Sequence, residues 1–307
     1  MVNVRPDRLV YELDEDFVSG ETLAAKLGVS RVAIHKRVKK MRAAGYPVES
    51  GPSGYRFVPG APAPKPLLRR YQGGLLTGAY YFGEVASTQD VLRELAAAGA
   101  GEGALVVAES QRAGRGRRGR SWLSPAGGLY FSLLLRPQFS PDALPLVSLA
   151  AGAALARAGD VGGLKWPNDL LAPDGRKLAG VLTEAELLGE EVRCLILGVG
   201  LNFAPPELEG AAGLAEFSQR ERVGVLARFL AAFERLYASL PEPEAVLEAW
   251  SRYDYTTGRE VRIHVPGGEV TGVAESVEED GSLLVRTPAG KRVRVSAGDV
   301  ELIGGFS

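Results

Sequence analysis

A short segment rich in arginine and glycine lies between two strongly apolar runs, and it constrains the fold more than any other feature. Residues 111–122 read QRAGRGRRGRSW and hold five arginines without one acidic residue. The apolar runs on either side, residues 104–108 and 129–135, are typical of buried strands. A basic loop is usually a solvated surface. Two flanking core strands favour an anion-binding loop instead, because loops on a rigid scaffold carry binding residues.

The glycines of this loop, Gly114, Gly116 and Gly119, spell the dinucleotide pattern G-x-G-x-x-G. In the dinucleotide fold that pattern precedes a helix, and an acidic residue follows about twenty positions later. Here the next residues are SWLSPAGG, which do not begin a helix, and residues 133–138 contain no acid. The Walker pattern G-x-x-x-x-G-K-[ST] does not occur in the sequence. We therefore expect arginine side chains to hold any nucleotide.

The composition narrows the class of protein. With 307 residues, 46% hydrophobic and 24% charged, the chain is expected to be globular with two or three domains, and its net charge of −1 argues against a polybasic coat for nucleic acid. The only cysteine, Cys194, lies in an apolar run and is predicted to be a buried thiol in a reducing compartment. Two histidines, His35 and His264, are too few for a histidine triad or zinc site. We expect neither export nor a membrane span, hence a cytoplasmic protein.

Residues 1–58 have the pattern of a winged helix-turn-helix domain. Apolar residues at helical spacing mark residues 5–16, a short helix ends at Gly28, and Ser30 is predicted to cap a second helix over residues 31–44. Residues 26–42 contain seven Lys or Arg and no acid. Residues 46–58 predict a hairpin wing.

The second helix of this domain is expected to enter DNA with its exposed N-terminal part, where recognition helices read base edges. Four apolar residues are expected to form its inward stripe: Val32, Ile34, Val38 and Met41. The residues expected to contact DNA are Ser30, Arg31, His35, Lys36 and Arg37.

The rest of the chain divides at a proline-rich segment. Residues 59–66 hold four prolines in eight positions, which predicts an extended, semi-rigid linker. Residues 67–255 carry the largest core, including an Ala/Leu-rich helix over residues 145–157. Two glycine-rich loops, residues 112–120 and 207–219, have few apolar anchors and are expected to be mobile without ligand and to become ordered around it. Residues 256–307 show short strands separated by glycine turns, the pattern of a small antiparallel barrel.

Four motifs occur in a fixed order along the central region: residues 114–120, residues 165–169 (KWPND), residues 177–180 and residues 198–202. On these motifs, and over essentially its whole length, the chain resembles the bifunctional biotin protein ligases that also repress the biotin operon. The resemblance implies an α+β fold with an N-terminal winged helix-turn-helix, a central mixed-sheet domain of the class II synthetase-like type with helices on one face, and a C-terminal SH3-like β-barrel.

The same resemblance implies the chemistry. ATP with Mg²⁺ would convert biotin to biotinyl-5′-AMP, and a lysine of the biotin carboxyl carrier protein would then accept the biotin. Lys177 and Arg117 would be catalytic, and Asp169 would contact the metal. Biotin would be bound by Ser87, Thr88, Gln89, Gln111, Arg115, Gly116, Arg117 and Lys177. ATP or the adenylate would be bound by Arg117, Arg120, Trp122, Lys165, Asn168, Asp169 and Asn202.

Several alternatives remain open from the residues alone. Ser87 and Thr88 are also good helix caps, and Lys165 and Trp166 are equally suited to packing. The acid substrate could be lipoate or octanoate, or the central domain could sense a ligand without catalysis.

We further expect biotinyl-5′-AMP to produce a homodimer that binds operator DNA of the biotin genes, since one helix-turn-helix covers one half-site. The strand over residues 192–203 is expected to form an edge for that dimer.

Overall fold

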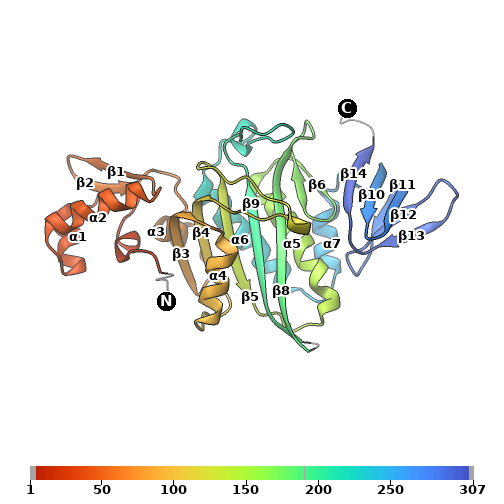
Figure 1. Cartoon of the computed structure of the whole chain (residues 1–307), viewed down its shortest axis with the longest axis horizontal. Helices are drawn as coiled ribbons and strands as arrows, with labels where there is room; N and C mark the ends of the chain where they lie inside the picture. The colour runs from red at the N-terminus through yellow and green to blue at the C-terminus, as the bar shows by residue number, and fades with distance from the viewer. Residues whose placement is uncertain (1–4, 190, 304–307) are drawn as a thin grey trace.

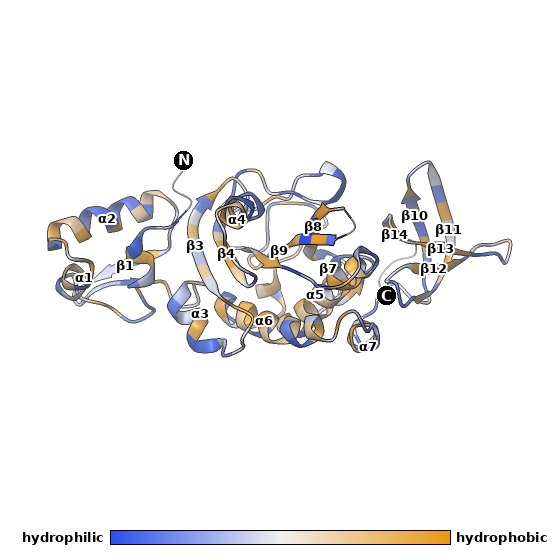
Figure 2. Ribbon diagram, turned by 90° about the horizontal axis from the view of Figure 1, so that it is seen from below, coloured by the Kyte–Doolittle hydropathy of each residue, from blue (hydrophilic) through white to orange (hydrophobic). Residues whose placement is uncertain are grey.

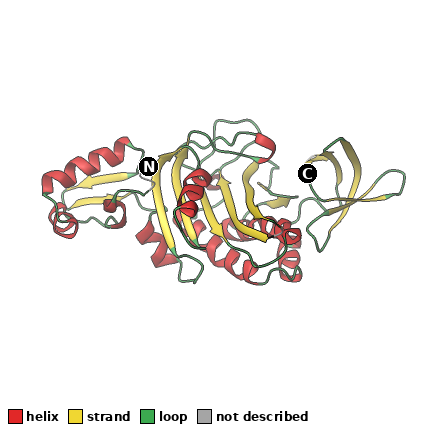
Figure 3. Cartoon of the chain, turned by 60° about the horizontal axis from the view of Figure 1, so that its bottom comes forward, coloured by secondary structure: helices red, strands yellow, loops and turns green. Residues whose placement is uncertain are grey.

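The structure of the protein is a computed structural model, which describes residues 5–189 and 191–303. Three parts follow one another along its longest axis: a small helical part, a large central domain and a small β domain (Figure 1). Their strands form separate sheets of two, seven and five strands (Figure 3). The predicted α+β fold with three such parts is confirmed. Residues 1–4 and 304–307 of the two predicted terminal domains lie outside the described residues.

The first part has the winged helix-turn-helix arrangement. Its elements are a 3₁₀ turn at Arg8–Tyr11, α1 (Gly20–Leu27), α2 (Arg31–Ala43), β1 (Val48–Gly51) and β2 (Gly54–Phe57). The Gly28 backbone is left-handed with φ 65° and ends α1, as glycine readily does. The hydroxyl of Ser30 accepts the Ala33 N–H and begins α2. The segment over residues 5–16 forms only this 3₁₀ turn, so its apolar spacing overstated its helix length.

The proline-rich segment differs from the extended linker predicted over residues 59–66. The segment begins with a turn at residues 59–60, where Gly60 has a φ of 83°, and Pro64 already begins α3 (Pro64–Arg70). Proline suits the first turn of a helix, where its missing N–H leaves no hydrogen bond unmade. Residues 60–64 are buried rather than solvated. The two domains are therefore joined by a packed connection.

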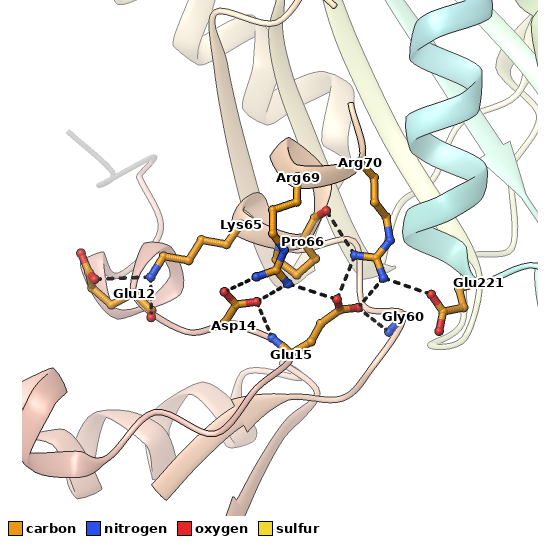
Figure 4. A network of polar contacts seen from close by, with 9 residues as sticks. All are labelled: Glu12, Asp14, Glu15, Gly60, Lys65, Pro66, Arg69, Arg70 and Glu221. Carbon is orange, nitrogen blue, oxygen red and sulfur yellow. Dashed lines mark hydrogen bonds and ion pairs between the residues drawn. The ribbon is translucent and has the colours of Figure 1, made fainter. Parts of the chain in front are cut away.

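Ion pairs also hold the first part against the central domain (Figure 4). Arg69 donates two 2.6 Å hydrogen bonds to the Asp14 carboxylate. Arg70 contacts both oxygens of Glu15, at 2.8 and 3.2 Å, and reaches Glu221 at 3.3 Å. Glu15 also accepts the N–H of Gly60 at 3.0 Å. One acidic segment of the first part is thus bound by a basic helix of the second.

The central domain is built on a mixed seven-stranded sheet in the order β3-β4-β5-β9-β8-β7-β6. Only β3 and β4 are parallel. The strands are β3 (Gly78–Val85), β4 (Ala104–Gln111), β5 (Leu129–Leu135), β6 (Gly163–Lys165), β7 (Asp169–Leu171), β8 (Lys177–Leu188) and β9 (Glu191–Leu201). All of β5 is buried, as its continuous apolar run predicts.

Helices cover both faces of this sheet, so the prediction of helices on one face is wrong. On one side lie α5 (Leu144–Gly159), α6 (Arg222–Ala238) and α7 (Glu244–Ser251), and on the other lies α4 (Thr88–Ala97) (Figure 2). Leu92 and Leu95 of α4 form a second core with Val106, Leu134 and Ile196. Alternate residues of the same strands face the main core, which explains why these strands are apolar throughout.

The prediction that residues 192–203 form a sheet edge is also wrong. Strand β9 lies inside the sheet, paired with β5 on one side and β8 on the other. The edge strands are β3 and β6, and the part of β8 beyond Gly180 also has a free side, because β7 pairs only with Lys177 to Gly180. Sequence alone shows how apolar a strand is and not which strands lie beside it.

The loop predicted over residues 207–219 is only partly without structure. Residues 211–214 are buried, and a 3₁₀ turn spans Leu214–Glu216. Small alanine and glycine side chains allow this close packing without any apolar pattern. The predicted mobility of the loop stays a prediction.

The C-terminal part is a five-stranded antiparallel sheet with β13 and β14 at its edges. Its strands are β10 (Glu260–Val265), β11 (Gly268–Val277), β12 (Leu283–Arg286), β13 (Arg292–Val295) and β14 (Asp299–Ile303). The indole of Trp166 is buried between this part and the central domain and donates to the Gly281 carbonyl at 2.9 Å. Among the described helices, none has the length and apolarity to cross a membrane.

Candidate ligand site

The predicted ligand residues surround one cavity of about 260 Å³ in the central domain. It lies over β8 and β9, between the start of α4 and the arginine loop. Every residue predicted to bind biotin or the adenylate lines it except Lys165. Those that line it are Ser87, Thr88, Gln89, Gln111, Arg115, Gly116, Arg117, Arg120, Trp122, Asn168, Asp169, Lys177 and Asn202. Residues far apart in the sequence are thus brought to one place.

The start of α4 forms one end of the cavity. Ser87 occupies the N-cap position but makes no capping hydrogen bond with its side chain. Instead, the Gln111 side-chain carbonyl accepts the Thr88 N–H at 2.8 Å and the Thr88 hydroxyl at 3.1 Å. The Ser87 side chain is buried and lines the cavity. Because Gln111 already caps the helix, capping alone does not explain Ser87.

The floor of the cavity is made of glycine. Gly180 and Gly200 are cross-strand partners on β8 and β9. A Cβ atom on Gly200 would lie 2.4 Å from the indole nitrogen of Trp122, and one on Gly198 would lie 2.9 Å from the Gln89 amide carbon. Any side chain at these positions would fill the space, so the cavity depends on their being glycine. The G-x-G spacing of residues 198 and 200 was the signal, since alternate strand residues share a face.

Asp169 is the buried acidic centre of the site. Its Oδ1 lies 2.7 Å from the Lys177 Nζ, and its Oδ2 lies 3.1 Å from the Lys165 Nζ. Burial raises the pKa of Asp169, but the two lysines outweigh it and lower the pKa below its ordinary value. Lys177 lines the cavity and Lys165 does not, so the two lysines share an acid but only one faces the cavity.

The arginine loop is a folded excursion from the sheet. Isolated antiparallel bridges join Gln111 to Ser124 and Arg115 to Ser121. At its tip, Arg117–Gly119 form a single 3₁₀ turn in which Arg118 has a φ of 56°. Positive φ is uncommon outside glycine, and such residues gather at functional sites.

Most arginines of the loop contact acids elsewhere in the fold. Arg115 donates to both oxygens of Asp90 on α4, at 2.9 and 2.8 Å. Arg118 and Arg120 contact Asp299 at the start of β14, at 3.4 and 2.7 Å. Arg112 contacts Glu84 at 3.2 Å. The loop is therefore attached at its base to α4 and at its tip to the C-terminal part.

Arg117 differs from its neighbours because its hydrogen bonds go to neutral groups. It donates to the Asn168 side-chain carbonyl at 3.2 Å and to the Gly298 carbonyl at 3.1 Å. Burial lowers its pKa, whereas the more distant Asp299 and Asp169 act in the opposite direction. Arginine stays protonated at neutral pH in any case. Arg117 therefore presents a half-buried charge at the cavity that an anionic ligand can neutralise.

Sequence reasoning expected the loop over residues 207–219 to close around the ligand but named none of the residues that form one wall of the cavity. This wall is formed by Pro206, Leu208, Glu209, Gly210 and Ala211 from the loop after β9. Leu208 is 55% exposed, although leucine is usually buried. An exposed leucine at the mouth of a cavity is suited to cover an apolar ligand surface, but no pattern in the sequence marks it.

The predicted DNA-binding residues lie mostly on one exposed surface. Ser30, Arg31, His35 and Lys36 are exposed. Arg37 is half-buried and turns toward Asp7, at 3.4 Å. Val32, predicted to face inward, is 65% exposed, so that part of the inward stripe is wrong. Ile34, Val38 and Met41 are buried as predicted.

Comparisons with protein families agree with this arrangement. The biotin/lipoate A/B protein ligase family matches residues 82–202, an HTH domain matches residues 8–56, and the biotin protein ligase C-terminal domain matches residues 256–303. The fold and the cavity, with these matches, define a protein ligase of the biotin/lipoate class that carries a helix-turn-helix domain.

Individual relatives identify the family within that class. The bifunctional ligase/repressor BirA of Bacillus spizizenii is 34% identical over 96% of both chains, and that of Escherichia coli is 32% identical over 92% of both. A biotin protein ligase from Aquifex aeolicus, solved in complex with biotin and ATP, matches with a TM-score of 0.62 and 31% identity over 74% of this chain and 99% of its own. The chain belongs to the family of bifunctional biotin protein ligase/repressors, as the motifs predict.

Proposed function

We propose that this protein joins biotin and ATP into biotinyl-5′-AMP and transfers the biotin to a lysine of the biotin carboxyl carrier protein. The observation that carries the proposal is a single cavity that combines a glycine floor with Lys177, Arg117 and the start of α4. Such a cavity offers an apolar floor for a ring system and cations for a carboxylate and a phosphate.

In the first step, a carboxylate oxygen of biotin attacks the α-phosphorus of ATP, and the bond to pyrophosphate breaks. The nucleophile is already ionised at neutral pH, so no base is needed. The obstacle is the approach of two anions. Lys177 and Arg117 would reduce the repulsion between these anions, because cations fixed where charge develops stabilise the transition state. Before ligand binding, Asp169 holds Lys177 in place.

In the second step, the amine of the acceptor lysine attacks the acyl carbon of the adenylate. The carbon–oxygen bond to the phosphate breaks, AMP leaves, and the amine nitrogen loses a proton. Arg115 and Gln111 keep the biotin end fixed in this scheme. Asn168 and Asn202 lie on the side of Lys177 and Asp169, where they would hold the adenylate.

Mg²⁺ belongs to the proposal as the ion that accompanies ATP. Magnesium sites of this type use one or two carboxylates and the substrate phosphates. Asp169 fits as one such carboxylate, and across residues 5–189 and 191–303 no group of three His, Cys, Asp or Glu side chains is placed to hold a metal by itself. When bound, Mg²⁺ would neutralise phosphate charge.

The test is ATP–pyrophosphate exchange with biotin, lipoate and octanoate compared at equal concentrations. We expect exchange with biotin alone. Exchange with lipoate or octanoate instead would assign another acid to the same scaffold, and the absence of exchange with all three would leave a sensor without catalysis.

We also propose that the adenylate favours a homodimer that binds operator DNA of the biotin genes. Beyond Gly180, β8 is paired with β9 on one side only in the described structure, and its end carries Leu187 and Leu188, 52% and 70% exposed. Unpaired strand edges readily pair with a second chain. Sedimentation with and without biotin plus ATP tests this part, and a monomer under both conditions would contradict it.

A further inference from the structure

The exposed face of α2 carries lysines and one large apolar residue, Val32. Residues 34, 38 and 41 point into the core and are spaced as one side of a helix. Residues 32, 36 and 39 have the same spacing but are displaced by two residues, about half a turn. They lie on the opposite side and are all exposed. Val32 therefore lies at the N-terminal end of the exposed row that continues with Lys36 and Lys39.

The helix itself gives no reason for valine at this position. A β-branched residue forms helices less readily than lysine or alanine, because its χ1 freedom is restricted there. Val32 lies in the first turn and is 65% exposed. Three other exposed apolar residues have a visible partner. The ring of Phe17 lies under the Arg56 guanidinium at 4.5 Å, and Leu123 and Leu208 line the cavity.

The surroundings of Val32 fit a nucleic-acid ligand. Arg31 and Lys36 beside it, together with Lys39, have no ion pair with an acid in the part of the chain that the structure describes. Such cations are suited to phosphates. In the major groove, thymine alone presents a methyl group, and an apolar side chain contacts it. The first turn of a recognition helix is also where base edges are reached.

We propose that Val32 is a specificity-determining residue that contacts the C5 methyl group of a thymine in the major groove of target DNA. The inference rests on the DNA-binding part of the proposed function. In this arrangement Lys36 and Lys39 hold the phosphate backbone, and Val32 distinguishes A·T pairs at one position of each half-site.

The experiment begins with the full chain, biotin and ATP, mixed with duplexes of randomised sequence. From the enriched duplexes, each thymine is replaced in turn by uracil, which lacks only the methyl group. For the wild-type protein we expect one symmetry-related position where the replacement weakens binding about fourfold, the effect of removing one buried methyl group.

Val32→Ala tests whether that effect belongs to Val32. Alanine preserves the helix and removes both methyl groups, so the uracil replacement should cost nothing at that position. Val32→Thr retains one methyl group and should keep part of the effect. Lys36→Ala is the matched control, because it should weaken binding to every duplex while leaving the uracil effect unchanged. Biotin-dependent exchange should be the same in all these variants.

Two results would overturn the inference. An equal uracil effect in the wild type and in Val32→Ala would remove Val32 from base recognition while leaving DNA binding intact. The absence of any enriched duplex, together with equal affinity for all sequences, would overturn both the role of Val32 and the operator-binding function.

Discussion

The arginine loop and helix α2 are both rich in cations, but most cations of the loop are paired with carboxylates and those on the exposed face of α2 are not. In the loop, Arg112, Arg115, Arg118 and Arg120 contact carboxylates. On the exposed face of α2, among the described residues, Arg31, Lys36, Lys39 and Lys40 have no such partner. The loop belongs to a site with a fixed geometry, whereas the helix presents charge to solvent.

This difference fits the two kinds of ligand that we propose for these regions. A small anion must be met by few groups in one arrangement, and acids on neighbouring elements hold the arginines in position until it binds. A DNA duplex offers phosphates at many places. The affinity of a protein for DNA comes largely from counterions that the DNA releases when unpaired lysines and arginines bind its phosphates. Mutations should therefore act on geometry in the first region and on total charge in the second.

The largest effect is expected at Lys177. It can be compared with Lys165, a second lysine that contacts the same carboxylate. Lys177 and Lys165 both contact Asp169, but only Lys177 lines the cavity. Lys177→Ala should lower biotin-dependent exchange about 100-fold or more, since one fixed donor in a site of this type is worth that much. Lys165→Ala should lower it less than about tenfold. Equal losses would show that Asp169, rather than the position of the lysine, governs activity, and circular dichroism verifies the fold of both variants.

A smaller effect is expected at Arg117, compared with Arg112 of the same loop. Arg117→Ala removes a half-buried charge at the cavity and should lower kcat/KM for biotin roughly 10- to 100-fold, the value of a charge-assisted contact of about 1.5–3 kcal/mol. Arg112 is 69% exposed and does not line the cavity, so Arg112→Ala should leave the kinetics unchanged. If both variants behave alike, the loop acts through its total charge and the contrast with α2 disappears.

Much of the molecule could be predicted from its sequence because local patterns carry the necessary information. The hairpin wing, the buried strands around the arginine loop and the family motifs each depend on spacing or on residue type within a short segment. The motifs and the family resemblance also named about half of the residues that line the cavity. Gly180, Gly198 and Gly200 stood within the family motifs, but their place in the floor of the cavity was not predicted.

What could not be predicted depends on neighbours that are distant in sequence. An edge of the central sheet was assigned to β9, although β3 and β6 are the edge strands and only the distal part of β8 has a free side, since strand order is not encoded in any one strand. Val32 was assigned to the core because apolar residues usually are, but its register is set by Ile34, Val38 and Met41. The acids that pair with the arginine loop, Asp90 and Asp299, come from a helix and a strand that the loop does not adjoin in sequence.

The charge of α2 is expected to act with little dependence on geometry. Lys36→Ala should reduce the slope of log affinity against log salt concentration by about 1 and weaken specific and non-specific DNA binding alike. Biotin-dependent exchange should not change, because Lys36 lies in another domain from the cavity. The measurement is a salt titration of DNA binding by the wild-type and variant proteins with biotin and ATP present. A variant with an unchanged slope would mean that Lys36 contacts no phosphate.

The smallest effect concerns Asp299, which pairs with two arginines of the loop. Both pairs are partly exposed, with Arg120 63% and Asp299 27% exposed, and pairs of this kind contribute about 0–1 kcal/mol to folding. Asp299→Asn should therefore leave the unfolding temperature nearly unchanged. The carboxylate competes with an incoming polyphosphate for Arg118 and Arg120, so its removal should lower KM for ATP about two- to fivefold without changing kcat.

Glu301→Gln is the matched control for that variant. Glu301 lies on the same strand, β14, and contacts Arg262 at 3.2 Å, away from the arginine loop. Its removal should leave KM for ATP unchanged. A higher KM or a lower kcat in Asp299→Asn would mean that Asp299 positions the arginines for catalysis rather than competing with ATP. The loop would then depend on the C-terminal part for its active geometry, and the contrast with the independently charged surface of α2 would become sharper.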